Sequence, residues 1–242
     1  MEEAYDALAD RVQAALEQRG DSPSPWLVGV AGVPGSGKSS LVQAVCKRLC
    51  ERGTPAVVVP MDGFHYYRAQ LDAMPDPPLA HARRGAEWTF DARSYHACLA
   101  GIKATGDGLA PTFEHGVGDP RPAGVAVQRH HRVVLSEGNY LLLGAEPWWR
   151  LGELWDDTWY VDCCVDEAMR RVFRRQTGNG VAAQTSRWRI AANDRQVWGG
   201  WGAVLEGWDE GPNAEQIATT RGRAALVVPG TLPQSAAVAE AA

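Results

Sequence analysis

Eight residues from Gly32 to Ser39 have the types and the spacing of a phosphate-binding loop. They read Gly-Val-Pro-Gly-Ser-Gly-Lys-Ser and fit the P-loop pattern GxxxxGKS. The glycines allow main-chain N–H groups to converge on phosphate oxygens. Lys38 is predicted to reach the β- and γ-phosphates of a nucleoside triphosphate, and the Ser39 hydroxyl to bind Mg²⁺. The predicted nucleotide-binding residues are Gly32, Val33, Pro34, Gly35, Ser36, Gly37, Lys38, Ser39 and Ser40.

The residues on either side of this loop predict the strand and the helix that a P-loop requires. Residues 26–31 (WLVGVA) form a short apolar run typical of a buried strand. Apolar residues then recur at helical spacing from Leu41 to Leu49, and Gly53 is a typical helix stop. A glycine-rich turn without a ligand is the alternative, but the order of strand, loop and helix favours phosphate binding.

Two carboxylates follow apolar runs that we predict to be strands. Asp62 follows residues 55–61 (PAVVVPM), and Glu137 follows residues 132–136 (RVVLS). Ligands bind at the carboxyl ends of such strands, so Asp62 is predicted to accept a proton from an attacking hydroxyl or to orient it. Glu137 is predicted to act on Mg²⁺ directly or from the next shell, because a carboxylate there needs a cation or water. A turn-forming Asp-Gly and a capping turn are the alternatives.

Four arginines lie at positions 170, 171, 174 and 175, on a helix predicted from about Asp166 to Gln176. Arginines in the last turns of a helix often complement its dipole and face solvent. A Gly-Asn-Gly break follows, however, as expected for a hinge. Arg171, Arg174 and Arg175 are therefore the candidates for a lid, where one or more of them stabilises charge on a transferring phosphoryl group.

Strands and helices alternate along the remaining sequence. Asp91 is predicted to cap a helix that ends near Gly106, and further strands are expected at residues 158–162 and 224–228. This alternation predicts an α/β fold, a three-layer P-loop NTPase architecture whose mostly parallel sheet has helices on both faces.

Other segments are expected to lie outside the main sheet. Residues 111–115 and 124–127 predict a hairpin in a small substrate lobe. Residues 72–84 carry three prolines and no clear period, so we expect an ordered excursion over the active face. We divide the chain into an N-terminal amphipathic helix with its linker (1–25), a P-loop domain (26–230) and a tail expected to be disordered (231–242).

The composition limits the classes of partner. The 242 residues are 45% hydrophobic and carry a net charge of −5, which argues against an obligatory nucleic-acid partner. No run approaches the roughly 18 apolar residues that span a membrane. Five cysteines without metal-binding spacing, and an N-terminus without the pattern of a secretory signal, indicate reduced thiols and a cytoplasmic location. The sequence is compatible with a homodimer.

Three classes of P-loop protein can be tested on the sequence. A GTPase needs NKxD and DxxG, and neither string occurs. A transporter ATPase needs LSGGQ on a helix, whereas the nearest match, LSEGN at 135–139, ends an apolar strand. A small-molecule kinase needs an acid facing the acceptor hydroxyl, an acid near Mg²⁺ and mobile arginines. All three have candidates in the residues above.

Six blocks occur in the order GVPGSGKS, MDGFHYY, RRGAEWTFDA, PTFEHGVGDP, VVLSEGNYLLL and the arginine-rich helix. Together they resemble the phosphoribulokinase/uridine kinase/pantothenate kinase family across about residues 26–230. The likeness is nearest to the nucleoside- or sugar-kinase-like branch with the EGNYLLL block. The resemblance implies transfer of the γ-phosphoryl group of ATP, with Mg²⁺, to a hydroxyl of a small nucleoside, sugar or pantothenate-like metabolite.

The resemblance also implies roles for individual residues. Asp62 matches a catalytic base or substrate ligand, and Glu137 lies near the metal. Phe90, Asp91 and His115 would line the acceptor site. His65 and Arg84 join this set as candidates, because they flank Asp62 and the TFD block. The alternative to a kinase is a regulatory ATP-binding module that has kept the P-loop and lost turnover.

Overall fold

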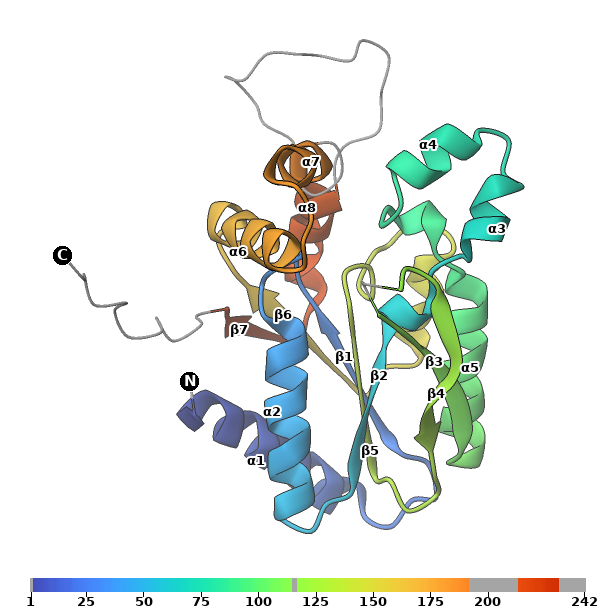
Figure 1. Ribbon diagram of the computed structural model, residues 1–242. Coiled ribbons are helices and arrows are strands. Elements are labelled where there is room, and N and C mark those ends of the chain that lie inside the picture. Colours follow the sequence, from blue (N-terminus) through green and yellow to red (C-terminus); the bar gives the residue numbers. More distant parts are fainter. Residues whose placement is uncertain (1, 115–116, 192–212, 231–242) are drawn as a thin grey trace, which may run out of the picture.

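The computed structural model describes residues 2–114, 117–191 and 213–230 (Figure 1). At its centre is a parallel five-stranded sheet in the order β2-β5-β1-β6-β7. The sheet confirms the predicted parallel α/β architecture, and each predicted strand is present. The strands are β1 (Trp26–Ala31), β2 (Ala56–Pro60), β5 (Val133–Gly138), β6 (Asp157–Asp162) and β7 (Leu226–Pro229).

Both faces of the sheet are covered, because successive strand residues point to opposite sides. In β1, Val28 and Val30 are buried in one hydrophobic core, whereas Leu27 and Ala31 are buried in the other. The first core includes residues of two helices, α1 (Glu2–Arg19) and α2 (Lys38–Glu51). The second includes, among other elements, α5 (Ala92–Thr105) and the 3₁₀ turn η3 (Trp148–Glu153).

Helix α1 is part of the same core as the P-loop helix. Leu8 and Val12 are buried against α2 and the sheet. Arg11 adds a bidentate ion pair to Asp157 at the start of β6, with N···O distances of 2.7 and 3.0 Å. The Asp157 carboxylate also accepts a hydrogen bond from the Trp159 indole at 2.8 Å. The N-terminal helix is therefore fixed to the sheet by apolar packing and by a partly buried charge pair.

A small lobe lies beside the sheet, as predicted. Its antiparallel hairpin pairs Gly108 with Val127 and Phe113 with Pro120. Within the excursion expected at residues 72–84, residues 77–82 form a helix that the sequence analysis did not predict. The Asp76 carboxylate accepts a hydrogen bond from the Leu79 N–H, and prolines occupy the first turn, where no N–H is needed. The lobe comprises η1 (Met61–Phe64), α3 (Arg68–Asp72), α4 (Pro77–Ala82), η2 (Glu87–Thr89), β3 (Gly108–Phe113) and β4 (Pro120–Val127).

The remaining helices lie on the other side of the strand ends from α3 and α4 (Figure 1). They are α6 (Val165–Gly178), α7 (Ala183–Arg189), α8 (Asn213–Ala218) and the 3₁₀ turn η5 (Thr219–Arg223). The Trp-rich segment at 196–211 and the tail predicted at 231–242 lie outside the described residues. Within the described ranges, no helix is long and apolar enough to cross a membrane.

Candidate active site

The P-loop connects the carboxyl end of β1 to α2. Gly37 caps this helix in the left-handed region, with φ +102°. Gly35 has φ +79°, and a Cβ placed there would lie 2.3 Å from the carbonyl oxygen of Ala168 in α6. Glycine is thus required at position 35 both by the backbone and by the close approach of α6. The N-terminus of α2 faces the loop, as a phosphate site requires.

Lys38 is buried at the base of this loop, with only 7% of its surface exposed. Its Nζ donates to the carbonyl oxygen of Val33 at 3.1 Å and to Oδ1 of Asn139 at 2.9 Å. Burial lowers the pKa of the Lys38 ammonium, while the fields of Glu137 and Asp62 oppose that shift. The ammonium is therefore held in place before any phosphate arrives.

Sequence reasoning did not single out Asn139. It lies 101 residues from Lys38 in the chain, one residue beyond the end of β5. The contact depends on the order of the strands, which the sequence pattern does not give: β5 pairs with β1, and Gly138 lies opposite Ala31. A side chain that follows Gly138 is consequently a neighbour of the P-loop.

Glu137 and Ser39 meet at the same place. The Ser39 hydroxyl donates to Oε1 of Glu137 at 3.1 Å. Burial raises the pKa of the Glu137 carboxyl, Lys38 opposes the rise and Asp62 adds to it. Asp62 lies in η1, directly after β2, and its carboxylate acts on both Lys38 and Glu137. The structure thus brings together the P-loop lysine and the two acids that sequence analysis selected.

The residues present fit a nucleoside triphosphate with a divalent cation. The Ser36 hydroxyl is buried inside the loop with no hydrogen-bond partner among the described residues, as expected of a group aimed at a phosphate. Ser39 and Glu137 offer hard oxygen donors, which Mg²⁺ prefers. No cluster of three or more metal-ligating side chains occurs in the described part of the chain. Phosphate oxygens and water would therefore supply most of the ligands, as is usual for Mg²⁺ bound with a nucleotide.

The side chains proposed for the acceptor site lie between η1 and the hairpin. The His65 ring stacks on Phe113 at 4.4 Å and lies against Phe90 at 4.0 Å, measured between ring centroids. Its Nδ1 donates to the carbonyl oxygen of Asp62 at 2.8 Å, which fixes the ring next to the candidate base. Phe90 is only 4% exposed, so it supports His65 from the core.

Arg84 packs against the same aromatic cluster of His65, Phe90 and Phe113. Its guanidinium lies over the Phe113 ring at 5.6 Å, donates to the Tyr66 carbonyl oxygen at 2.8 Å and reaches Asp119 at 3.3 Å. Arg84 therefore joins the hairpin to the segment that carries His65.

Asp91 caps α5, because its carboxylate accepts hydrogen bonds from the Ser94 N–H and hydroxyl groups. His115, the remaining predicted acceptor residue, lies outside the described residues.

The three lid candidates on α6 have different surroundings. Arg171 is mostly buried and donates to the carbonyl oxygens of Gly230 at 3.2 Å and Gly35 at 3.4 Å. Arg174 is exposed, with no ion pair among the described residues. Arg175 is also exposed, but its charge acts on both Lys38 and Glu137. Arg175 is therefore the candidate for the lid role.

Comparisons with known proteins agree with this geometry. A candidate uridine kinase of Schizosaccharomyces pombe, C227.14, is 38% identical over 196 residues, which cover 79% of this chain and 81% of the relative. The ATP-dependent kinase-like protein notR' of Aspergillus versicolor is 39% identical over 131 residues, or 52% of this chain and 76% of that one. The crystal structure of a candidate fructose transport system kinase from Silicibacter sp. TM1040 matches with a TM-score of 0.77 and 30% identity. That match covers 93% of this chain and 98% of the other.

The fold is that of the P-loop kinases. The chain belongs to the phosphoribulokinase/uridine kinase/pantothenate kinase family of P-loop proteins, as the sequence motifs predicted. The YFH7 kinase of Saccharomyces cerevisiae shares the fold, with a TM-score of 0.67 at 20% identity.

One family model that matches part of the chain describes a GTPase rather than a kinase. The family model of the methylmalonyl-CoA mutase-associated GTPase MeaB matches residues 5–67. This range ends soon after Asp62 and contains the P-loop, which GTPases and kinases share. It reaches none of Glu137, Asn139 or Arg175, so it reflects nucleotide binding in the first quarter of the chain.

Proposed function

We propose that the protein is a kinase that transfers the γ-phosphoryl group of ATP to a hydroxyl group of a small metabolite. One observation carries the proposal: Lys38, Asp62 and Glu137, from three separate segments, lie within one another's electrostatic field at the carboxyl ends of β1, β2 and β5. A regulatory module that only bound nucleotide would need the lysine but not an acid beside the acceptor.

Each residue then has a task in the transfer. The amides of residues 32–40 and the Lys38 ammonium would hold the phosphates, and Ser39 and Glu137 would hold Mg²⁺. When bound, Mg²⁺ supplies charge neutralisation of the β- and γ-phosphates. Asp62 accepts the proton of the attacking hydroxyl or aligns it for attack. The positive charge of Arg175 stabilises the negative charge that spreads over the phosphoryl oxygens in the transition state.

The acceptor binds, in this proposal, beside η1 and the hairpin, next to Asp62. His65, held by Phe90 and Phe113, and Arg84, held by Asp119, provide a rigid wall next to Asp62. Such a wall suits a small polar molecule that carries several hydroxyl groups. The names of two relatives, a candidate uridine kinase and a candidate fructose transport system kinase, support a nucleoside or sugar as the first compounds to test.

ADP release in the presence of a panel of acceptors tests the function. The panel contains uridine, cytidine, fructose, other sugars and pantothenate, each with ATP and Mg²⁺. We expect one acceptor to stimulate ADP release and to appear as a phosphate monoester by mass spectrometry. Lys38→Ala should remove this activity, because the loop loses the charge that holds the transferring group. Tight ATP binding with no stimulation by any acceptor would instead identify a nucleotide-binding module.

A further inference from the structure

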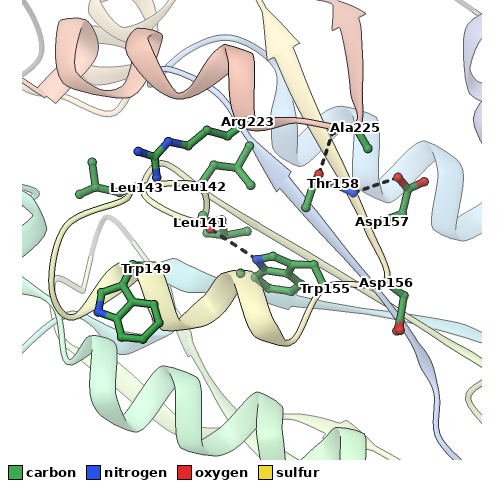
Figure 2. Close-up of a pocket in the computed structure, with 11 residues that line it drawn as sticks. Leu141, Leu142, Leu143, Trp149, Trp155, Asp156, Asp157, Thr158, Arg223 and Ala225 are labelled. Atoms are coloured by element: carbon green, nitrogen blue, oxygen red, sulfur yellow. Dashed lines mark hydrogen bonds between the residues drawn. The ribbon is translucent and has the colours of Figure 1, made fainter.

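A cavity of about 320 Å³ lies away from the P-loop. Asp157 and Thr158, the first residues of β6, and Ala225, directly before β7, contribute to its wall (Figure 2). The nucleotide-binding residues lie at the opposite, carboxyl ends of these strands. The volume is at the lower end of the range for small-molecule sites, enough for one or two fused rings.

The floor of the cavity is apolar and aromatic. Leu141, Leu142, Trp149 and Trp155 line it, and Trp149 remains 43% exposed. The Trp155 ring lies flat on the sheet because β1 has a glycine beneath it: a Cβ on Gly29 would meet the ring at 2.7 Å. Its indole N–H donates to the Leu141 carbonyl oxygen at 3.4 Å (Figure 2). An aromatic ligand would find a preformed surface for stacking there.

The charges around the cavity leave one cation without a counter-ion. Asp156 accepts hydrogen bonds from Lys103 and from the Leu27 N–H, and Asp157 is paired with Arg11. Both carboxylates are therefore compensated. Arg223, in contrast, has no ion pair or hydrogen-bond partner in the part of the chain that the structure describes. The uncompensated charge of the site is positive.

The position of Arg223 depends on a second glycine. A Cβ on Gly144 would lie 1.9 Å from a terminal nitrogen of the guanidinium, so the side chain rests on the backbone there. Figure 2 shows Arg223 directed toward the segment that carries Leu142 and Leu143. Gly144 has no positive φ, so alanine at this position displaces the arginine without straining the backbone.

From these observations we propose that this cavity is a second ligand site, which binds a small aromatic anion. The ring system lies on Trp149 and Trp155, and its carboxylate or phosphate pairs with Arg223. A guanidinium favours such groups because it can donate two parallel hydrogen bonds to them. The site is independent of the phosphoryl transfer proposed above, since it shares no residue with the P-loop or with the acids.

Calorimetry with 2-naphthoate and its neutral analogue 2-naphthylmethanol tests the proposal. We expect saturable binding of 2-naphthoate that saturating MgATP does not displace, and at least tenfold weaker binding of the alcohol. Arg223→Gln and Gly144→Ala should each raise the Kd for 2-naphthoate at least tenfold. Gly101→Ala is the matched control, because its Cβ would meet nothing within 4 Å, and it should bind as the wild type does.

A second measurement locates the ligand. The indole N–H resonances of Trp149 and Trp155 should shift on titration with 2-naphthoate, while that of Trp26 stays in place. Three results would overturn the proposal: no saturable binding, equal affinity for the acid and the alcohol, or an Arg223→Gln variant that binds 2-naphthoate normally. Displacement by ATP would also overturn it, because it would place the ligand in the nucleotide site.

Discussion

Arg175, rather than Arg171 or Arg174, is expected to act on the transferring phosphoryl group. Truncation of Arg175 to alanine removes a cation whose field reaches Lys38 and Glu137. The loss of one preorganised group that stabilises developing charge typically costs about 10²–10³ in kcat, or roughly 2.7–4 kcal/mol. Because the side chain is exposed and has no partner among the described residues, we expect the stability of Arg175→Ala to be unchanged.

Arg171→Ala should instead lower the stability of the protein. This guanidinium joins the carbonyl oxygens of Gly35 and Gly230 and pairs with Glu167. Hydrogen bonds from a charged donor contribute about 1.5–3 kcal/mol each, and these two are long, so we expect a loss of roughly 2–3 kcal/mol. For a chain of this size the melting temperature falls by about 4–12 °C. ATP affinity falls as well, because the P-loop carbonyl loses its support.

Arg174→Ala is the control, since it removes an exposed arginine from the same helix and touches no site residue. The three variants are compared by thermal unfolding, by ATP titration and by steady-state turnover with the acceptor found in the panel. The reasoning predicts a loss of kcat for Arg175→Ala, a loss of stability for Arg171→Ala and neither for Arg174→Ala. Equal turnover of the Arg174 and Arg175 variants would refute the assignment of the lid arginine.

Three further predictions concern an acid, an amide and an imidazole. Asp62→Asn should lower turnover by about 10²-fold or more while ATP binding is retained, because the amide cannot accept the proton; unchanged turnover would show that Asp62 only forms a turn. Asn139→Asp should weaken ATP binding about tenfold, since a carboxylate next to Lys38 competes with phosphate for the ammonium; unaltered affinity in a titration would contradict this. Burial, and then His130, lower the pKa of His131 below its ordinary value near 6.5. The unfolded chain therefore binds the proton more readily, so stability falls as pH decreases below about 6.5. Urea unfolding at pH 7.5 and 5.5 should show a smaller loss for His131→Gln than for the wild type, and an equal loss would exclude a contribution from this ring.

Local patterns predicted most of the secondary structure. The apolar run from Val133 to Leu135 and the turn chemistry near Gly106 are signals carried by neighbouring residues, and both were interpreted correctly. The helix at 77–82 had a local signal as well: Asp76 followed by two prolines is a typical helix start. The lack of periodicity nevertheless gave no helix prediction for this segment, and tertiary packing determines helicity in so short a stretch.

The contacts within the candidate site could not be predicted from the sequence, because they depend on the order of the strands in the sheet. Asn139 and Lys38 are 101 residues apart, and Arg171 and Gly35 are 136 residues apart. A sequence pattern can place each of these residues at the end of a strand or on a helix. It cannot tell which strand lies next to β1 or which side of α6 faces the P-loop. The roles of single residues among the four arginines therefore became distinguishable only in three dimensions.

The juxtaposition of the two acids follows from the register of the sheet and from one glycine. Pairing of β2 with β5 places Pro60 opposite Glu137, so the chain that continues into Asp62 passes over the end of β5. A Cβ on Gly138 would lie 2.5 Å from the Cβ of Met61, which would push this turn away from the strand. Gly138 thus brings Asp62 within electrostatic reach of Glu137, while Met61 is buried beneath it. The Glu-Gly pair at the end of β5 is therefore a single geometric unit, in which the glycine sets the distance between the acid proposed to bind metal and the acid proposed to receive the proton.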